Sequence, residues 1–246
     1  MGEAKKRGTK EERTAEAKQR SLMEMDFTLL TKDAIYAPQS QKRAILLDIW
    51  MNRLKNMAAN DEKNGSQPSS IDSQVKAFRE VLSFIWDNDY SGACHSTSAI
   101  LYMLLAESDL EPTLCIGEVC LKNSYFDHSW VELDGKVMDA AVSFPLKNGT
   151  SEFAGGPVFR SIDLSTNKGT DLSYGAKSTQ GLDDIALVVL KNDLSGYHDM
   201  QVADVQEEQV RIWNLTVLLA ANIGLTVTTD DLKRKYGSVK RALRGQ

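Results

Sequence analysis

A cysteine, a histidine and an aspartate occur in this order along the chain, each in a local sequence that suits one member of a catalytic triad. Cys94 follows the polar turn 87–92 and begins the apolar segment 94–106, which predicts a helix. A thiol in the first turn of a helix lies at the positive end of the helix dipole, which favours the nucleophilic thiolate. The alternative interpretation of Cys94 is a buried structural cysteine, because free cysteine is among the most buried residue types.

The other two residues fall on a predicted β-hairpin. Residues 127–133 and 136–142 have the composition of two strands, and the Asp-Gly pair between them is typical of a two-residue hairpin loop. This loop places Asp139 opposite Trp130, on the face of the sheet that also carries His128, because side chains alternate along a strand. His128 and Asp139 are then diagonal neighbours at about 7–8 Å. A carboxylate there can accept the imidazole N–H and orient the ring.

Each of these two residues also has an ordinary structural interpretation. His128 alone is more simply a solvent-facing or hydrogen-bonded strand histidine, and Asp139 a charged residue on a sheet edge. The apolar neighbours of Asp139 favour a carboxylate that needs a partner. The ordered set of three is therefore more specific than any one member, although a hairpin shifted by one residue would separate His128 from Asp139.

These motifs resemble the transglutaminase-like superfamily of cysteine proteases, which are relatives of the papain-like fold. The resemblance covers about residues 86–145 and rests on Gly92-Ala93-Cys94 before an apolar helix, on the strand 128–132 and on Asp139 in the next strand. It implies an α+β fold, with the nucleophile helix packed on an antiparallel sheet and additional helices at both ends of the chain. It also implies that Cys94 is the nucleophile, His128 the base and Asp139 the residue that orients it.

Two features depart from the pattern of this family. The residue after the nucleophile is His95, where relatives often carry an aromatic residue, and no motif assigns the oxyanion donor. The side chains of Asn88 and Trp86, together with the backbone N–H of Cys94, are the candidate donors. We expect His95 and Trp130 to be neighbours of the substrate site.

The preferred function is a thiol hydrolase, a protease or amidase that cleaves a peptide or protein amide through an acyl-enzyme. Acyl transfer to an amine, as in transglutaminases, uses the same triad and remains open. A non-catalytic interaction protein built on the same fold is the third hypothesis, since fold does not fix chemistry. We expect no cofactor and no metal site.

Composition restricts the partners and the cellular location that we expect for this protein. The chain has 246 residues and a net charge of −5, which argues against a general nucleic-acid binder. Three cysteines and no apolar leader after Met1 favour a reducing, cytoplasmic location. Cys115 and Cys120 lie in one predicted strand, 114–121, face opposite sides and are interpreted as structural. No apolar run approaches about 18 residues, so we expect no association with a membrane.

The chain divides into a charged arm at 1–22, a helical segment at 23–60, a catalytic domain at 70–225 and a basic helix at 226–246, with a linker at 61–70. The helical segment is predicted from apolar spacing over its second half. The basic helix, capped by a threonine near its start, could meet an anionic partner, although a solvated face is the simpler interpretation.

Four further elements are expected. A helix follows the linker, and another spans about 206–221. Residues 143–180 are expected to be mostly irregular, with a short strand at 159–164. The apolar run 185–190 reads as a buried strand.

Overall fold

The computed structural model describes residues 41–63, 68–144, 154–204 and 207–245. The predicted charged arm 1–22 and the first part of the predicted helical segment 23–60 lie outside these residues.

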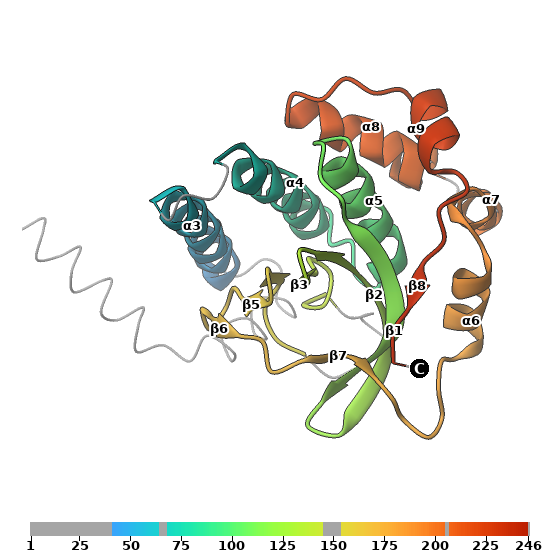
Figure 1. Ribbon diagram of the computed structural model, residues 1–246, viewed down its shortest axis with the longest axis horizontal. Helices are drawn as coiled ribbons and strands as arrows, with labels where there is room; N and C mark the ends of the chain where they lie inside the picture. Colours follow the sequence, from blue (N-terminus) through green and yellow to red (C-terminus); the bar gives the residue numbers. More distant parts are fainter. Residues whose placement is uncertain (1–40, 64–67, 145–153, 205–206, 246) are drawn as a thin grey trace, which may run out of the picture.

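A five-stranded sheet forms the centre of the molecule (Figure 1). Its strands are β1 (Thr113–Leu121), β2 (Ser124–Leu133), β3 (Lys136–Met138), β7 (Ser173–Ala176) and β8 (Ala242–Leu243). The order is β3-β2-β1-β7 with antiparallel neighbours, and β8 pairs in parallel with β1. A second, smaller sheet consists of β4 (Val158–Phe159), β5 (Ile162–Asp163) and β6 (Lys168–Gly169).

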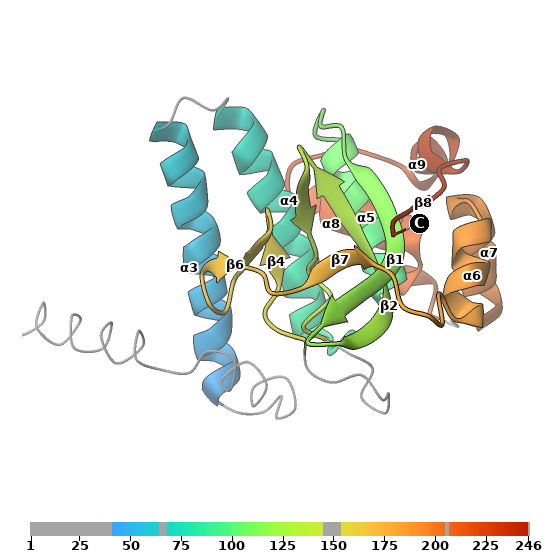
Figure 2. The same cartoon turned by 60° about the horizontal axis from the view of Figure 1, so that its bottom comes forward.

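Helices lie behind the sheet and on both sides of it (Figure 2). They are α3 (Gln41–Lys63), α4 (Pro68–Asp87), α5 (Cys94–Ala106), α6 (Asp184–Lys191), α7 (Leu194–Asp204), the 3₁₀ turn η1 (Glu208–Val210), α8 (Ile212–Asn222) and α9 (Thr229–Tyr236). α5 packs on β1 and β2 and lies between α4 and α8. This arrangement confirms the predicted α+β class. No helix in the described part of the chain is both long and apolar enough to span a membrane.

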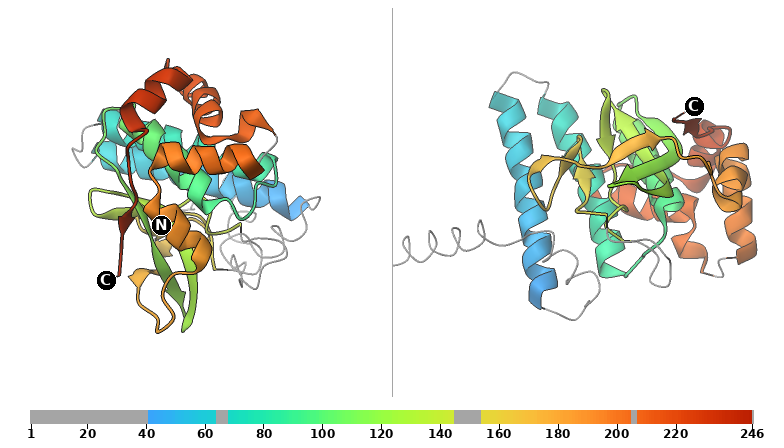
Figure 3. Two further views of the ribbon diagram at one scale, coloured as in Figure 1. Left: turned by 90° about the vertical axis from the view of Figure 1, so that its right-hand side faces the viewer. Right: turned by 90° about the horizontal axis from the view of Figure 1, so that it is seen from below.

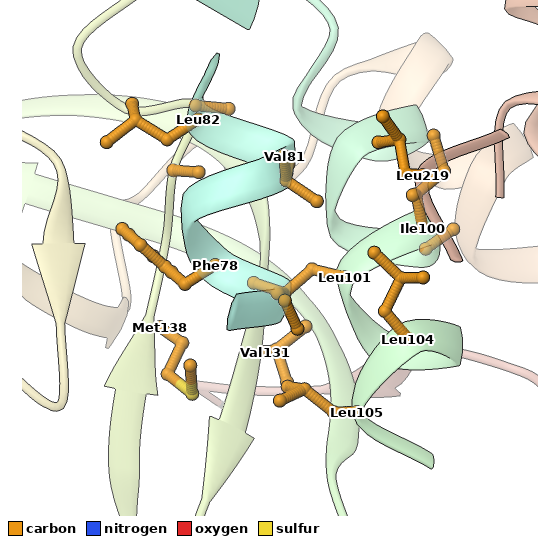
Figure 4. Close-up of a cluster of buried hydrophobic side chains, with 14 of the residues drawn as sticks. Phe78, Val81, Leu82, Ile100, Leu101, Leu104, Leu105, Val131, Met138 and Leu219 are labelled. Carbon is orange, nitrogen blue, oxygen red and sulfur yellow. The ribbon is translucent and has the colours of Figure 1, made fainter. Parts of the chain in front are cut away.

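α5 is apolar around most of its circumference because it is covered on several sides. Figure 4 shows its side chains between those of α4, β2, β3 and α8. The fully buried residues at this contact include Phe78, Leu101, Leu104, Val131 and Met138. Each such side chain contributes about 1.5–3 kcal/mol when it is buried. The helix that presents Cys94 is therefore held firmly against the sheet.

The opposite face of the sheet carries a second apolar cluster. It comprises Cys115, Val119, Trp130, Val142, Val158 and Leu172. The small sheet adds to the packing at one end, where Phe159 meets Phe78 of α4 with ring centroids 5.1 Å apart. Both faces of the central strands are thus covered, which explains why β1 is buried along most of its length.

The two N-terminal helices are longer than expected. α3 continues to Lys63, and α4 already begins at Pro68, so the predicted linker 61–70 is wrong except for residues 64–67, which lie outside the described residues. Pro68 is compatible with a helix start because the first helical position needs no backbone N–H donor.

The apolar run 185–190 is a helix and not the predicted buried strand. It belongs to α6, whose N-cap Asp183 accepts a hydrogen bond from the backbone N–H of Ala186. Ile185 is 68 % exposed, whereas Val189 is buried. The periodicity of such a short apolar run cannot distinguish a strand from a helix. Here the N-cap Asp183 favours the helix.

The stretch 143–180 is more regular than predicted. The single strand expected at 159–164 is a tight hairpin of β4 and β5, which turns at Arg160 and Ser161, both with positive φ angles of 51° and 63°. β7, which was not predicted, joins the central sheet next to β1.

The C-terminal prediction is partly wrong. The helix predicted at about 206–221 starts only at Ile212, after the turn η1. Thr228 caps α9 as expected, but that helix ends at Tyr236, and the segment after it runs to the edge of the sheet as β8 (Figure 3). Gly237 ends the helix, and of the later basic residues Arg241 is buried, Arg244 is half-buried and Lys240 is exposed. The continuous basic helix at 226–246 therefore does not exist.

Candidate active site

Cys94 is the first residue of α5. The preceding Gly92 has a φ angle of 71°, which suits glycine, and donates its N–H to the carbonyl of Phe144 at 2.8 Å. The N-cap residue Ala93 offers no side-chain cap. Cys94, a partly exposed residue, thus lies at an open helix N-terminus, as the sequence predicts.

His128 and Asp139 lie together, buried to 5 % and 3 % exposure. Nε2 of His128 and Oδ2 of Asp139 are 2.7 Å apart. The predicted two-residue loop is confirmed, since Leu133 pairs with Lys136. This register keeps the imidazole and the carboxylate on one face of the sheet.

The return strand is nevertheless shorter than predicted. β3 ends at Met138, so Asp139 has no ladder partner in Trp130. Instead, its backbone N–H and carbonyl bond to Val158 of β4 at 2.7 and 2.8 Å. Asp139 therefore stands where the chain leaves one sheet and meets the other, a position fixed by long-range pairing.

Four donors saturate the carboxylate of Asp139. Oδ1 accepts the backbone N–H groups of Ala141 and Val142, both at 3.0 Å. Oδ2 accepts the hydroxyl of Tyr174 at 2.8 Å in addition to the bond from His128. These bonds leave the carboxylate only one orientation.

Tyr174 is a site residue that sequence reasoning missed. It lies on β7, in the stretch regarded as irregular, 35 residues from Asp139. The buried position of its hydroxyl and the charge of Asp139 raise the pKa of Tyr174 well above its ordinary value. The phenol therefore stays protonated and donates. Only the brief alternation over 173–176 hinted at a strand here.

The electrostatics of the site favour a thiolate–imidazolium pair. Desolvation raises the pKa of Cys94, but interactions with His95 and His128 outweigh it and lower that pKa well below the ordinary 9.0. Burial lowers the pKa of His128, but the charges of Asp139 and Cys94 outweigh it and raise that pKa to about 10. Because Nε2 is bonded to Asp139, Nδ1 is the nitrogen left to interact with the sulfur.

His95 is a second imidazole beside the sulfur. Its Nδ1 lies 2.7 Å from Oγ of Ser129. Ser129 and His128 are successive residues of β2 and point to opposite faces of the strand. One strand thus orients both imidazoles that interact with Cys94. That His95 is a neighbour of the substrate site stays a prediction.

The other predicted neighbour, Trp130, is fully buried and offers no surface to a substrate. Its Nε1 donates to Glu132 at 3.1 Å, and its ring packs on Tyr174 with centroids 5.1 Å apart. Trp130 therefore packs against Tyr174 in the core. The prediction that Trp130 borders the substrate site is wrong.

Both predicted oxyanion side chains make contacts elsewhere in the structure. Asn88 donates its amide to the carbonyl of Phe84 at 2.9 Å, at the end of α4. Trp86 is 4 % exposed and packs edge-on against Trp50 and Phe144, so its ring belongs to the core. The backbone N–H of Cys94 stays a candidate, because the first turn of a helix has no internal acceptor for it.

The two other cysteines differ from Cys94. Cys115 is fully buried in β1, and burial together with Glu132 raises its pKa to about 12. Cys120 is partly exposed on the same strand. All three are free thiols. Within the described ranges, no group of three or more His, Cys, Asp or Glu side chains is arranged to hold a metal ion.

A comparison with protein families places the site in a known context. The family model described as "Transglutaminase-like superfamily" matches residues 39–146, which include Cys94, His128 and Asp139. Searches of curated proteins and of solved structures gave no match. Residues 39–146 are thus similar to the transglutaminase-like superfamily, the same family that the motifs in the sequence resemble.

Proposed function

We propose that the protein is a thiol hydrolase that cleaves an amide bond of a peptide or protein through a covalent acyl-enzyme. One observation carries the proposal: the buried pair of His128 and Asp139 at 2.7 Å, next to a thiol that favours its anionic form. A structural cysteine needs neither an oriented imidazole nor a helix N-terminus.

The reaction begins when the Cys94 thiolate attacks the substrate carbonyl carbon. A C–S bond forms, and the carbonyl oxygen takes the electron pair as an oxyanion next to the N–H groups at the start of α5. As the intermediate collapses, the C–N bond breaks and Nδ1 of His128 gives its proton to the leaving amine. The products of this half are a thioester on Cys94 and a free amine.

Water completes the cycle. The now neutral His128 takes a proton from water, whose oxygen attacks the thioester carbonyl. The C–S bond breaks, a carboxylic acid leaves, and the thiolate–imidazolium pair is restored. Asp139 keeps the proton of His128 on Nε2 throughout, so that Nδ1 faces the sulfur. A thiolate that must stay reduced agrees with the cytoplasmic location we propose.

Active-site acylation tests the proposal without knowledge of the natural substrate. p-Nitrophenyl acetate serves as a general acyl donor, and mass spectrometry of the digested protein locates the acetyl group. We expect rapid acetylation of Cys94 with a burst of nitrophenolate, and loss of this burst in His128→Asn. Cys120, also partly exposed, is the internal reference. Acetylation of Cys94 no faster than that of Cys120 would contradict the proposal.

A second measurement separates hydrolysis from acyl transfer. A mixture of peptides is incubated with the protein and with a dansylated alkylamine. New peptide termini or side-chain acids identify hydrolysis. Covalent incorporation of the amine identifies transfer, in which an amine replaces water as the nucleophile that attacks the thioester. Cys94→Ser is the control for both products.

A further inference from the structure

Arg241 is the most unusual charged residue in the described part of the chain. It is 4 % exposed, whereas no other lysine or arginine described there is buried. It follows α9 and directly precedes β8, whose Ala242 pairs with Cys115 of β1. The sheet therefore fixes its backbone. Taking an arginine out of water costs several kcal/mol unless an anion and hydrogen bonds compensate.

The contacts that Arg241 makes compensate only part of this desolvation free energy. Nη2 donates to the carbonyl of His95 at 2.9 Å, and the guanidinium carbon lies 4.6 Å from the ring centroid of Tyr197. Nε and Nη1 are buried and have no hydrogen-bond partner. No carboxylate among the described residues forms an ion pair with it.

The counter-charge can be found by elimination. Two groups act electrostatically on Arg241, namely Tyr197 and Cys94. Burial raises the pKa of Tyr197 to about 12, so the phenol is neutral at pH 7, and it is tied to Ser96 by a hydrogen bond of 2.8 Å. An arginine itself remains protonated in proteins. The Cys94 thiolate is then the negative charge that acts on the guanidinium.

We propose that Arg241 is a positioning residue for the nucleophile, which holds the first turn of α5 through the His95 carbonyl and whose buried charge is balanced by the Cys94 thiolate. This inference rests on the proposed function, because it requires Cys94 to react as a thiolate. Arg241 acts without touching substrate. Arg241 lies far outside residues 39–146, which contain Cys94, His128 and Asp139. The C-terminal segment therefore adds a residue to the site.

Replacement of Arg241 by methionine separates this role from a merely structural one. Exchanging a buried charge for an apolar side chain is often neutral or stabilising, so Arg241→Met should melt at the same or a higher temperature. The pKa of Cys94 should nevertheless rise by at least one unit, which moves the acid limb of its alkylation profile to higher pH by the same amount. A structural role predicts the reverse, with lower stability and an unchanged titration.

The measurement is iodoacetamide alkylation of the full chain across pH, followed at each cysteine by mass spectrometry. His95 from α5 and His128 from β2 act on Cys94, and Cys94 in turn acts on Tyr197 from α7 and on Arg241; the first three residues are kept in every variant. Arg241→Lys keeps the charge and should retain most of the acid shift. Lys240→Gln, which removes an exposed neighbouring charge, is the matched control and should titrate like the wild type.

Failure of the inference can be told from failure of the proposed function. If wild-type Cys94 alkylates with a pKa near 8.5, like a free thiol, both are overturned. If it alkylates at low pH and Arg241→Met titrates identically, only the role of Arg241 is overturned. A folded Arg241→Lys that has lost the shift would also contradict the charge argument. Should the methionine variant not fold, Arg241→Gln takes its place, because its amide can still donate to the His95 carbonyl.

Discussion

The position of one proton decides what the individual residues of the site can do. Between Cys94 and His128, the proton lies on the imidazole, because the thiol has a pKa well below 9.0 and the imidazolium a pKa of about 10. The active pair therefore forms as pH rises through the low pKa of Cys94. It is lost when His128 gives up its proton near pH 10.

The first prediction is a pH–rate profile for acylation of Cys94. The rate should reach a plateau below pH 9, at which an ordinary thiol is still ionising, and hydrolysis should fall near pH 10. In Asp139→Asn, the fall in rate at basic pH should move to lower pH, because the carboxylate no longer stabilises the imidazolium of His128. A rate that climbs steadily through pH 9 in the wild type would show an unactivated thiol.

The second prediction concerns Tyr174, which donates to Asp139 at 2.8 Å. In Tyr174→Phe, the carboxylate keeps three of its four donors but loses part of its orientation. We expect kcat to fall about tenfold, in line with about 1.5 kcal/mol for a hydrogen bond to a charged group, with KM unchanged. Asp139→Asn should cost more, about 10²–10⁴-fold. Equal losses in the two variants would contradict a purely supporting role for the phenol.

At the scale of elements, local sequence determines the site only in part. The Asp-Gly loop sets the register of β2 and β3, and apolar residues define α5, so Cys94 and His128 could be placed from nearby residues alone. The orientation of Asp139, by contrast, depends on its backbone pairing with Val158, and its fourth hydrogen-bond donor, Tyr174, lies on β7. These partners lie 19 and 35 residues away, and no local pattern records such pairings.

The same reason explains the errors at the C-terminus. Basic residues after Tyr236 look like the continuation of a charged helix when only periodicity is considered. In the structure, Arg244 instead forms a bidentate contact with Glu132 of β2, 112 residues away, and Arg241 reaches His95. Charge pattern alone cannot distinguish a solvated face from residues that meet a distant strand.

The third prediction tests how tightly β8 approaches β1. Gly117 of β1 faces the C-terminal segment, and a Cβ atom there would lie 2.9 Å from the carbonyl oxygen of Arg244. Gly117→Ala must displace one of two paired backbones, at about 1–3 kcal/mol by urea denaturation. Gly169→Ala, where nothing lies within 4 Å, is the matched control and should be nearly neutral. Equal stability of both variants would mean that the C-terminal segment is not held at this distance.

For the whole molecule, the segment that matches the family model does not contain every residue of the site. Residues 39–146 contain Cys94, His128 and Asp139, yet Tyr174 and Arg241 come from beyond them. The chain thus returns twice to the same sheet, as β7 and as β8, and each return brings one side chain to the site (Figure 1).

The fourth prediction follows from this return. A chain that ends at Gly237 loses β8, the pair of Arg244 with Glu132 and the charge of Arg241. We expect the free energy of unfolding to fall by at least about 2 kcal/mol, since a bidentate charged contact and strand pairing disappear together. Cys94 should then alkylate near the pH of an ordinary thiol. Unchanged melting together with retained reactivity at low pH would mean that the site is complete without the last strand, and that β7 and the family segment alone hold the thiolate.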